Sequence, residues 1–245
     1  AMGTDSSGQG NNFTVSGTIT QNVDTPSNNF ATLNPLQPQS TAYTFENGNL
    51  ATNGNTGNAW RSLFSTLAVS SGKYYFECKL ATTYSDSGNS FNIGVADIDQ
   101  ASQSDEKFGV KSRGYAYQQN GTKLNNNSSA SFGNRISVGD IVGCAVDLDN
   151  GKIYFHRNGT YENSGDPTTG STGTGSAFDI TSGYTYAPAF ATYYSADDIQ
   201  VNFGGGFFAT TAVSSAGTAP SGGGVFEYDC PTGYQSLCTK GINNF

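Results

Sequence analysis

The residues that could carry out acid–base chemistry are few and lie far apart in the chain. The sequence has one histidine, His156, which follows Phe155 in a strand-like segment close to an Asn158-Gly159 turn. Strand alternation places His156 on the face opposite Phe155, so we expect an exposed hairpin residue rather than a catalytic base. Serine is abundant, but no Gly-x-Ser-x-Gly stands between a strand and a helix, which disfavours a serine hydrolase.

The carboxylates form four close pairs, and glycoside cleavage requires such a pair as acid and as base or nucleophile. The pairs are Asp97/Asp99, Asp105/Glu106, Asp147/Asp149 and Asp197/Asp198. Asp147 and Asp149 share a strand face opposite Val146, and Asp149 begins an Asn-Gly turn. We therefore interpret all four pairs as structural or solvated, and we predict no catalytic residues.

Metal and phosphate motifs are also weak. Asp147-x-Asp149-x-Gly151 resembles the start of a calcium loop, but Asn158 stands where an EF-hand requires Glu. Gly204-Gly205-Gly206 is followed by neither Lys nor a helical pattern, so it is not a phosphate cradle. We expect no metal and no cofactor.

The four cysteines fall into two pairs of different character. Cys78 and Cys144 lie within strand-like patterns and have no Cys or His at metal-ligand spacing, which predicts core positions. Cys230 and Cys238 flank Pro231-Thr232-Gly233, a turn that could bring their Cα atoms within the ~4.4–6.8 Å of a disulfide. We therefore predict a Cys230–Cys238 disulfide.

Composition favours an all-β chain with an acidic surface. Charged residues make up 12% of 245 residues, against roughly 25% in an average domain, while 16 Phe and 14 Tyr supply strand-forming bulk. The net charge of −8 would repel a phosphate backbone, so nucleic acid is an unexpected partner. No apolar run reaches the ~18 residues of a membrane span, so we expect no membrane insertion.

The elements that must position these residues are short strands separated by Gly, Asn, Ser and Asp. Tyr74, Phe76, Cys78 and Leu80 share one strand face, as do Val142, Cys144, Val146 and Leu148. Asn150-Gly151 then predicts a hairpin to residues 152–157. We predict a two-sheet antiparallel β-sandwich over residues 41–208, after an extended N-terminal arm over 1–40. Residues 209–245 should pack back on the sandwich through Val225, Phe226 and Tyr228, or lead to a further module.

Six segments taken in order resemble the successive strands of a SPRY domain. They are residues 71–80, 91–97, 138–151, 153–159, 186–190 and 201–204. The resemblance covers roughly residues 60–208 and implies a concanavalin-like sandwich. The sequence departs from the family at Phe76, where the family often has Trp, and in a Gly/Thr-rich insertion at 163–176.

The flanking residues 24–35 and 226–238 are similar to segments that bracket SPRY-like modules in structural proteins of tailed bacteriophages. This resemblance implies a non-catalytic module on the virion surface, in a tail fibre or the capsid. Its expected partners are a host surface glycan or protein and other virion proteins. Two alternatives stay open: a glycan-cleaving enzyme on the same sandwich, and an architectural virion domain without a host ligand.

SPRY-like sandwiches differ in the loops at one end, and the resemblance implies a recognition surface there. The corresponding connections are residues 84–89, 99–113, 118–131 and 193–198. The candidate ligand-binding residues are Tyr84, Asp86, Arg113, Asn125, Tyr194 and Asp197. Tyr would stack, Asn and Asp would bond hydroxyls, and Arg113 would meet an acidic sugar or side chain. The lone Trp60 is interpreted as a packed residue at a sheet edge.

Overall fold

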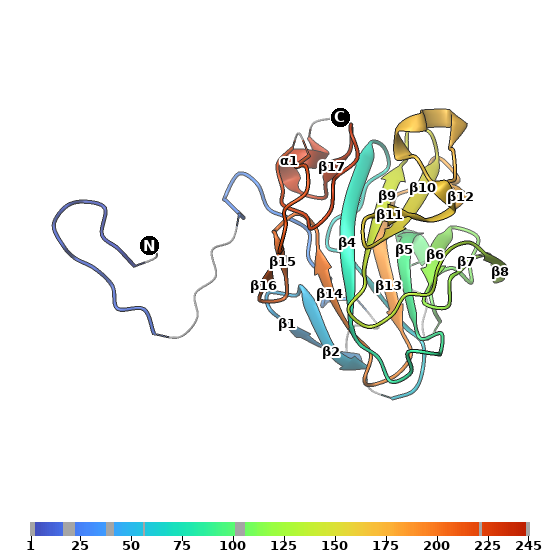
Figure 1. Cartoon of the computed structure of the whole chain (residues 1–245), viewed down its shortest axis with the longest axis horizontal. Helices are drawn as coiled ribbons and strands as arrows, with labels where there is room; N and C mark the ends of the chain where they lie inside the picture. Colours follow the sequence, from blue (N-terminus) through green and yellow to red (C-terminus); the bar gives the residue numbers. More distant parts are fainter. Residues whose placement is uncertain are drawn as a thin grey trace.

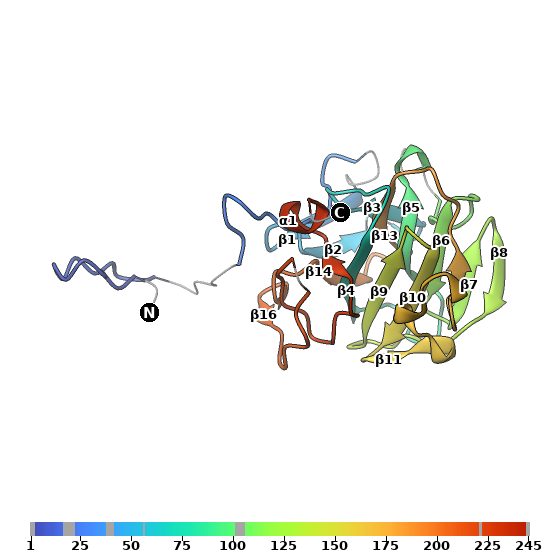
Figure 2. The ribbon, with the colours of Figure 1, turned by 90° about the horizontal axis from the view of Figure 1, so that it is seen from above.

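A computed structural model of the chain describes residues 3–16, 23–37, 42–55, 57–100, 106–220 and 222–243. Within these ranges the chain forms two large antiparallel sheets that pack as two layers of a sandwich (Figures 1 and 2). Residues 3–16 extend away from the sandwich (Figure 1). The predicted all-β sandwich is confirmed.

The larger sheet, nine-stranded over the described residues, is built around the long strand β4. Its order is β1 (Tyr43–Glu46), β2 (Ala51–Asn55), β14 (Asp198–Asn202), β4 (Lys73–Thr82), β9 (Ile141–Asp147), β10 (Lys152–Arg157) and β11 (Thr160–Tyr161). In addition, β12 (Phe178–Asp179) pairs with β10, and β17 (Gln235–Ser236) pairs in parallel with β4.

The second sheet has six strands in the described ranges, in the order β3 (Arg61–Phe64), β13 (Tyr186–Thr192), β5 (Phe91–Asp97), β6 (Gly114–Gln118), β7 (Thr122–Asn125) and β8 (Ser128–Ser131). A small hairpin joins β15 (Phe207–Phe208) to β16 (Thr211–Ala212). The helical elements with described bounds are short: the 3-10 turns Ile98–Gln100, Glu162–Ser164 and Pro167–Thr172 and the helix α1 (Thr239–Ile242).

The core between the sheets follows from strand alternation. Phe76 is fully buried at its centre and packs edge-on against Phe190, with ring centroids 5.9 Å apart. Cys78 and Cys144 are both fully buried in the same core, as predicted. The β9–β10 hairpin is also confirmed, with Asp147 opposite Lys152 and Gly151 at φ 64° in the turn.

The outward face of β4, β9 and β10 is buried as well, because the C-terminal chain lies over it (Figure 1). Tyr75 and Tyr154 on this face form a second apolar cluster with Phe226 and Tyr234. The prediction of an exposed His156 is therefore wrong: its side chain is 1% exposed. Strand alternation assigned His156 to the correct face of β10, the one opposite Phe155. This face is buried because Tyr228, from the C-terminal chain, packs against the His156 ring.

The predicted Cys230–Cys238 disulfide is not formed, and both buried thiols are free. The turn closed by Tyr234 N and Pro231 O leads into β17 alongside β4, so Cys238 continues past the sheet to α1. There Cys238 Sγ accepts a hydrogen bond from Gly241 N at 3.2 Å and caps the helix.

Candidate functional site

The predicted ligand-binding residues divide between the two ends of the six-stranded sheet. Strands β5 and β13 pair along their whole length, with Phe91 opposite Thr192 and Asp97 opposite Tyr186. Seven residues of strand separate these ends by about 20 Å. The 83–90 and 193–197 loops adjoin the Phe91 end, whereas Arg113 bonds Asp97 at the other.

Asp197 holds the two loops of the Phe91 end together. Its side chain is fully buried, and one oxygen accepts hydrogen bonds from Thr83 Oγ1 at 2.8 Å and Tyr84 N at 3.0 Å. The other oxygen accepts from Tyr193 N at 3.2 Å and Tyr194 N at 2.7 Å. Asp197 is therefore a positioning residue, and the prediction that it bonds ligand hydroxyls directly is wrong for a carboxylate so enclosed.

Four aromatic rings lie side by side at this end of the sandwich: Trp60, Tyr193, Tyr194 and Tyr84. We call them the aromatic ridge. The three tyrosines come from the two loops, and Trp60 directly precedes β3. Ring centroids are 5.6 Å apart from Trp60 to Tyr193, 4.8 Å from Tyr193 to Tyr194 and 4.7 Å from Tyr194 to Tyr84. Tyr84 is 72% exposed. Such an exposed aromatic side chain, packed against its neighbours, offers a flat surface at little further cost in conformational entropy.

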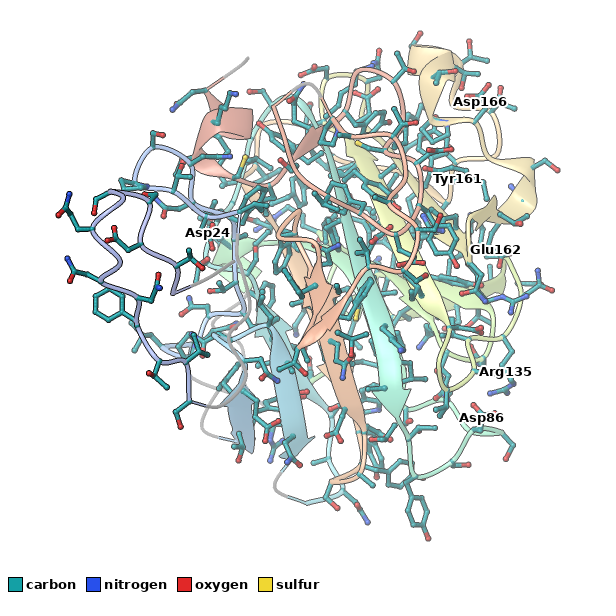
Figure 3. The ribbon with its side chains drawn as sticks, turned by 60° about the vertical axis from the view of Figure 1, so that its left-hand side comes forward. Asp24, Asp86, Arg135, Tyr161, Glu162 and Asp166 are labelled. Atoms are coloured by element: carbon teal, nitrogen blue, oxygen red, sulfur yellow. The ribbon has the colours of Figure 1, made fainter. Side chains whose placement is uncertain are left out.

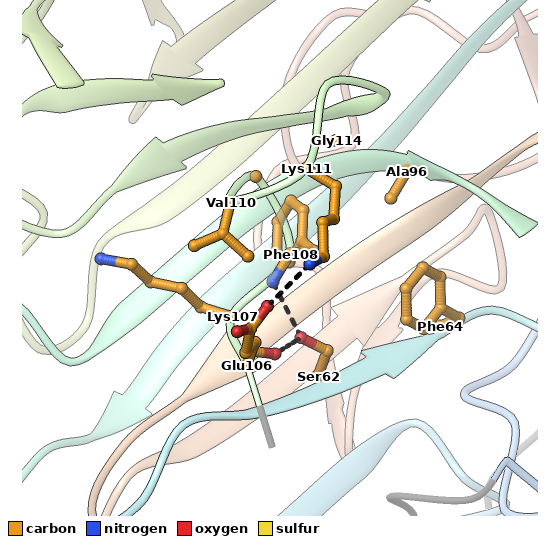
Figure 4. A pocket seen from close by; sticks show the side chains of 10 residues that line it. Ser62, Phe64, Ala96, Glu106, Lys107, Phe108, Val110, Lys111 and Gly114 are labelled. Atoms are coloured by element: carbon orange, nitrogen blue, oxygen red, sulfur yellow. Dashed lines mark hydrogen bonds and ion pairs between the residues drawn. The ribbon is translucent and has the colours of Figure 1, made fainter. Parts of the chain in front are cut away.

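Next to the ridge, a small, partly open hollow lies on the outer side of the six-stranded sheet (Figure 4). Phe64 and Phe108 line it, and Lys111 pairs with Glu106 at 3.5 Å. Lys107, which also lines the hollow, places its Nζ 4.9 Å from the centre of the Trp60 ring. Partial burial lowers the Lys107 pKa. The ridge and the hollow therefore adjoin through the Trp60–Lys107 contact.

Comparison with known families decides what kind of domain carries this surface. The model of the SPRY domain family matches residues 73–206, more than half of the chain. The chain belongs to the SPRY family. SPRY domains are protein–protein interaction modules and are generally non-catalytic.

A solved structure supports the fold of this SPRY domain. The crystal structure of the SPRY domain of human HERC1 matches with a TM-score of 0.52 and 16% sequence identity. The match covers 65% of this chain and 91% of that chain. Strands β1, β2 and β3 and the C-terminal chain lie outside the residues that match the family model.

Arg113 and Asn125 support a loop at the far end of the SPRY sandwich. The Arg113 guanidinium forms an ion pair with Asp97 and lies 4.2 Å from the ring centre of Tyr184. Asn125 Nδ2 donates to the carbonyl oxygens of Ser112 and Gly114, both at 2.8 Å. The structure thus does not bring this pair together with the aromatic ridge.

Asp86 lies on the ridge side of the SPRY sandwich, in the 83–90 loop. Its exposed carboxylate accepts from Val138 N at 3.1 Å, and its carbonyl oxygen accepts from Arg135 Nη1 at 2.9 Å (Figure 3). The sequence analysis placed Tyr193 in a recognition loop without selecting it as a candidate, and it interpreted Trp60 only as a packed residue. The Tyr193-Tyr194 doublet in the predicted 193–198 connection was the signal, because two adjacent aromatic side chains point in different directions and one of them can pack beneath the other.

Among the carboxylate pairs, Asp147 has a clear structural role in the SPRY domain. Asp147 is fully buried, pairs with Lys73 at 2.9 Å and accepts from Asn150 N at 2.9 Å in the hairpin turn. Asp105 lies outside the described residues. Within them, no group of three His, Cys, Asp or Glu is placed to hold a metal ion, and no helix is long and apolar enough to cross a membrane.

Proposed function

We propose that this SPRY domain is a non-catalytic recognition module whose partner binds at the aromatic ridge. The observation that carries the proposal is the exposed Tyr84 ring on Tyr194, held by loops that a buried Asp197 ties together. A preorganised aromatic surface loses little freedom on binding, and aromatic residues supply most binding hot spots.

We further propose that the module is displayed on the virion of a tailed bacteriophage, in a tail fibre or on the capsid. The resemblance of residues 24–35 and 226–238 to phage structural proteins supports this setting. There the ridge would contact a host surface protein or glycan, whose flat faces pack on tyrosine and tryptophan rings. Other virion proteins would hold the module in place.

The Tyr84→Ala/Tyr194→Ala double variant tests the site. The probes are a panel of immobilised bacterial polysaccharides and bacterial surface-protein extracts, measured by biolayer interferometry. We expect binding to weaken by at least about tenfold, because two contact rings are lost. The melting temperature should change little, because Tyr84 is 72% exposed.

Tyr184→Ala is the matched control, since this partly exposed ring lies against Arg113 at the opposite end. It should leave binding unchanged. Equal binding by the wild type and the folded double variant would place the site elsewhere. Release of reducing ends from any polysaccharide would favour the glycan-cleaving alternative, and binding to virion proteins alone would favour the architectural one.

A further inference from the structure

A partly buried lysine without a carboxylate partner lies at one end of the aromatic ridge. Lys107 Nζ is 4.9 Å from the centre of the Trp60 ring, and Figure 4 shows the Lys107 side chain directed away from Glu106. Within the part of the chain that the structure describes, Lys107 forms no ion pair. The ammonium group therefore faces an aromatic ring where a lysine in a folded protein often faces a carboxylate.

The neighbouring basic residues differ from Lys107, because their charged groups are already bound. Lys111 pairs with Glu106 at 3.5 Å. Arg135 donates to two carbonyl oxygens of the 83–90 loop, at 2.9 and 2.6 Å. Partial burial lowers the Lys107 pKa, and no nearby carboxylate raises it again. Lys107 has thus lost part of its water without gaining an anion in exchange.

Such a cation favours an anionic ligand. The free protein already bears the cost of removing water from Lys107, so a ligand carboxylate would gain a charge-assisted hydrogen bond without that cost. The three N–H donors of Nζ make no hydrogen bond to the residues that the structure describes. They can therefore donate to a ligand while the Trp60 ring stays in contact with the ammonium group.

The position of Lys107 indicates how the anion would be joined to the rest of the ligand. Trp60 is the ring of the ridge that Lys107 contacts, and the row continues through Tyr193 and Tyr194 to the exposed Tyr84. A sugar ring has a flat C–H face, and a uronic acid carries its carboxylate at the edge of that ring. One acidic sugar could therefore lie on a ridge ring and reach Lys107, while the neighbouring sugars pack along the tyrosines.

The charge of the whole chain limits how acidic this ligand can be. The net charge is −8, with 19 acidic and 11 basic side chains. A densely charged polyanion would be repelled along most of the surface. One unpaired lysine beside the ridge fits a chain of sugars in which carboxylates are separated by neutral residues.

We propose that the ligand of the aromatic ridge is an acidic polysaccharide with well-separated carboxylates, and that Lys107 selects it by donating to one of them. This inference rests on the proposed function, because it names the class of ligand that the ridge binds. The ridge rings contact the sugar faces, and Lys107 recognises the charge. An acidic peptide is the competing ligand, and the experiments below separate the two.

Chemical reduction of the ligand provides the first half of the test. Bacterial polysaccharides that contain uronic acids are immobilised in native form and in carboxyl-reduced form, in which carbodiimide and borohydride treatment converts each carboxylate to a primary alcohol. The reduced form keeps the sugar faces and loses the charge. By biolayer interferometry, the wild type should bind the native form at least about tenfold more tightly than the reduced form.

Lys107→Gln provides the second half. This variant should bind the native form about tenfold more weakly than the wild type does, and it should bind the two forms equally, because the same contact is lost in either way. Lys107→Arg keeps the positive charge and should keep the preference for the native form. Lys240→Gln is the matched control: it changes the net charge equally at an exposed position of α1 and should bind as the wild type does. All variants should melt near the wild-type temperature.

The outcomes separate this inference from the proposed function. Equal wild-type binding to the two forms, or undiminished binding by Lys107→Gln, would overturn the role of Lys107 even if Tyr84→Ala/Tyr194→Ala still abolishes binding. Binding of surface proteins alone, lost in both Lys107→Gln and the double tyrosine variant, would assign the carboxylate to a peptide and overturn the polysaccharide. Binding that depends on neither Tyr84 nor Tyr194 would overturn the recognition ridge itself.

Discussion

Asp197 is buried and lies beneath the ridge, yet it fixes the positions of the loops that carry the exposed tyrosines. Its four hydrogen bonds reach both loops that carry the ridge tyrosines. Asp197→Ala should lower the free energy of unfolding by about 2–4 kcal/mol, because buried donors lose a charged acceptor. Urea denaturation measures this loss. The exposed Asp99→Ala variant should stay within about 0.5 kcal/mol of the wild type.

Asp197→Ala should also weaken ligand binding at the ridge, provided that the variant is measured where it is still folded. Tyr84 and Tyr194 keep their rings in this variant but lose the backbone anchors that fix their spacing. An Asp197→Ala protein that binds with wild-type affinity would show that the loops keep their arrangement without this carboxylate.

At single positions, sequence reasoning identified exposed rings better than buried polar groups. Tyr84 and Tyr194 were selected because they lie in loops that the SPRY resemblance implies form a recognition surface, and the structure places their rings in contact. Asp197 was assigned the wrong role, since the sequence does not show that backbone amides converge on it. His156 was placed in solvent because the sequence does not show that Tyr228, which follows about 70 residues later, packs against its ring.

Within the strands, Gly143 of β9 makes room for the His156 ring on the outer face. It pairs with Glu77 on one side and with His156 on the other, and an added Cβ would lie 2.0 Å from His156 Nε2. Gly143→Ala should therefore destabilise the domain by about 1–3 kcal/mol through overpacking. Chemical denaturation would detect the change, and no loss of stability would mean that the ring has space to move.

A double-mutant cycle isolates this contact. His156→Ala removes the ring that the new methyl group would strike, at the cost of a cavity. The double variant should be more stable than the sum of the two single effects, by an interaction of about 0.5–3 kcal/mol. Additive effects would show that Gly143 serves β9 in another way.

Strand alternation predicted the elements but not everything that covers them. Phe76 and Cys78 face the core as expected. Tyr75 on the opposite face of β4 was a signal of a second buried layer, because a solvated sheet face rarely carries a large aromatic ring beside a carboxylate. The pattern within β4 could not identify the covering segment, whose contacts span about 150 residues of sequence.

For the whole molecule, the ridge tyrosines lie in loops that connect the two sheets, whereas Glu77 lies on the outward face of the larger sheet under Phe226 and Tyr228. The two regions should act independently. Glu77→Gln should therefore keep ligand binding at the ridge. Effects at sites that share no partners are usually additive. Loss of ligand binding in a folded Glu77→Gln protein would reveal a coupling between the ridge and the outward face of the larger sheet.

The thiols provide a last test at the scale of the whole molecule. A disulfide closing residues 230–238 would contribute about 2–3 kcal/mol through the entropy of the unfolded chain, or several degrees in melting temperature. Forming it would require Cys238 to leave the α1 cap, where its Sγ bonds Gly241 N, and to give up its contact with Ser236. We therefore expect the same melting temperature with and without reductant, and four reactive thiols per chain after unfolding without reductant. Two reactive thiols, together with a reductant-sensitive melting temperature, would show that the bridge forms and that the C-terminal chain has a different arrangement around α1.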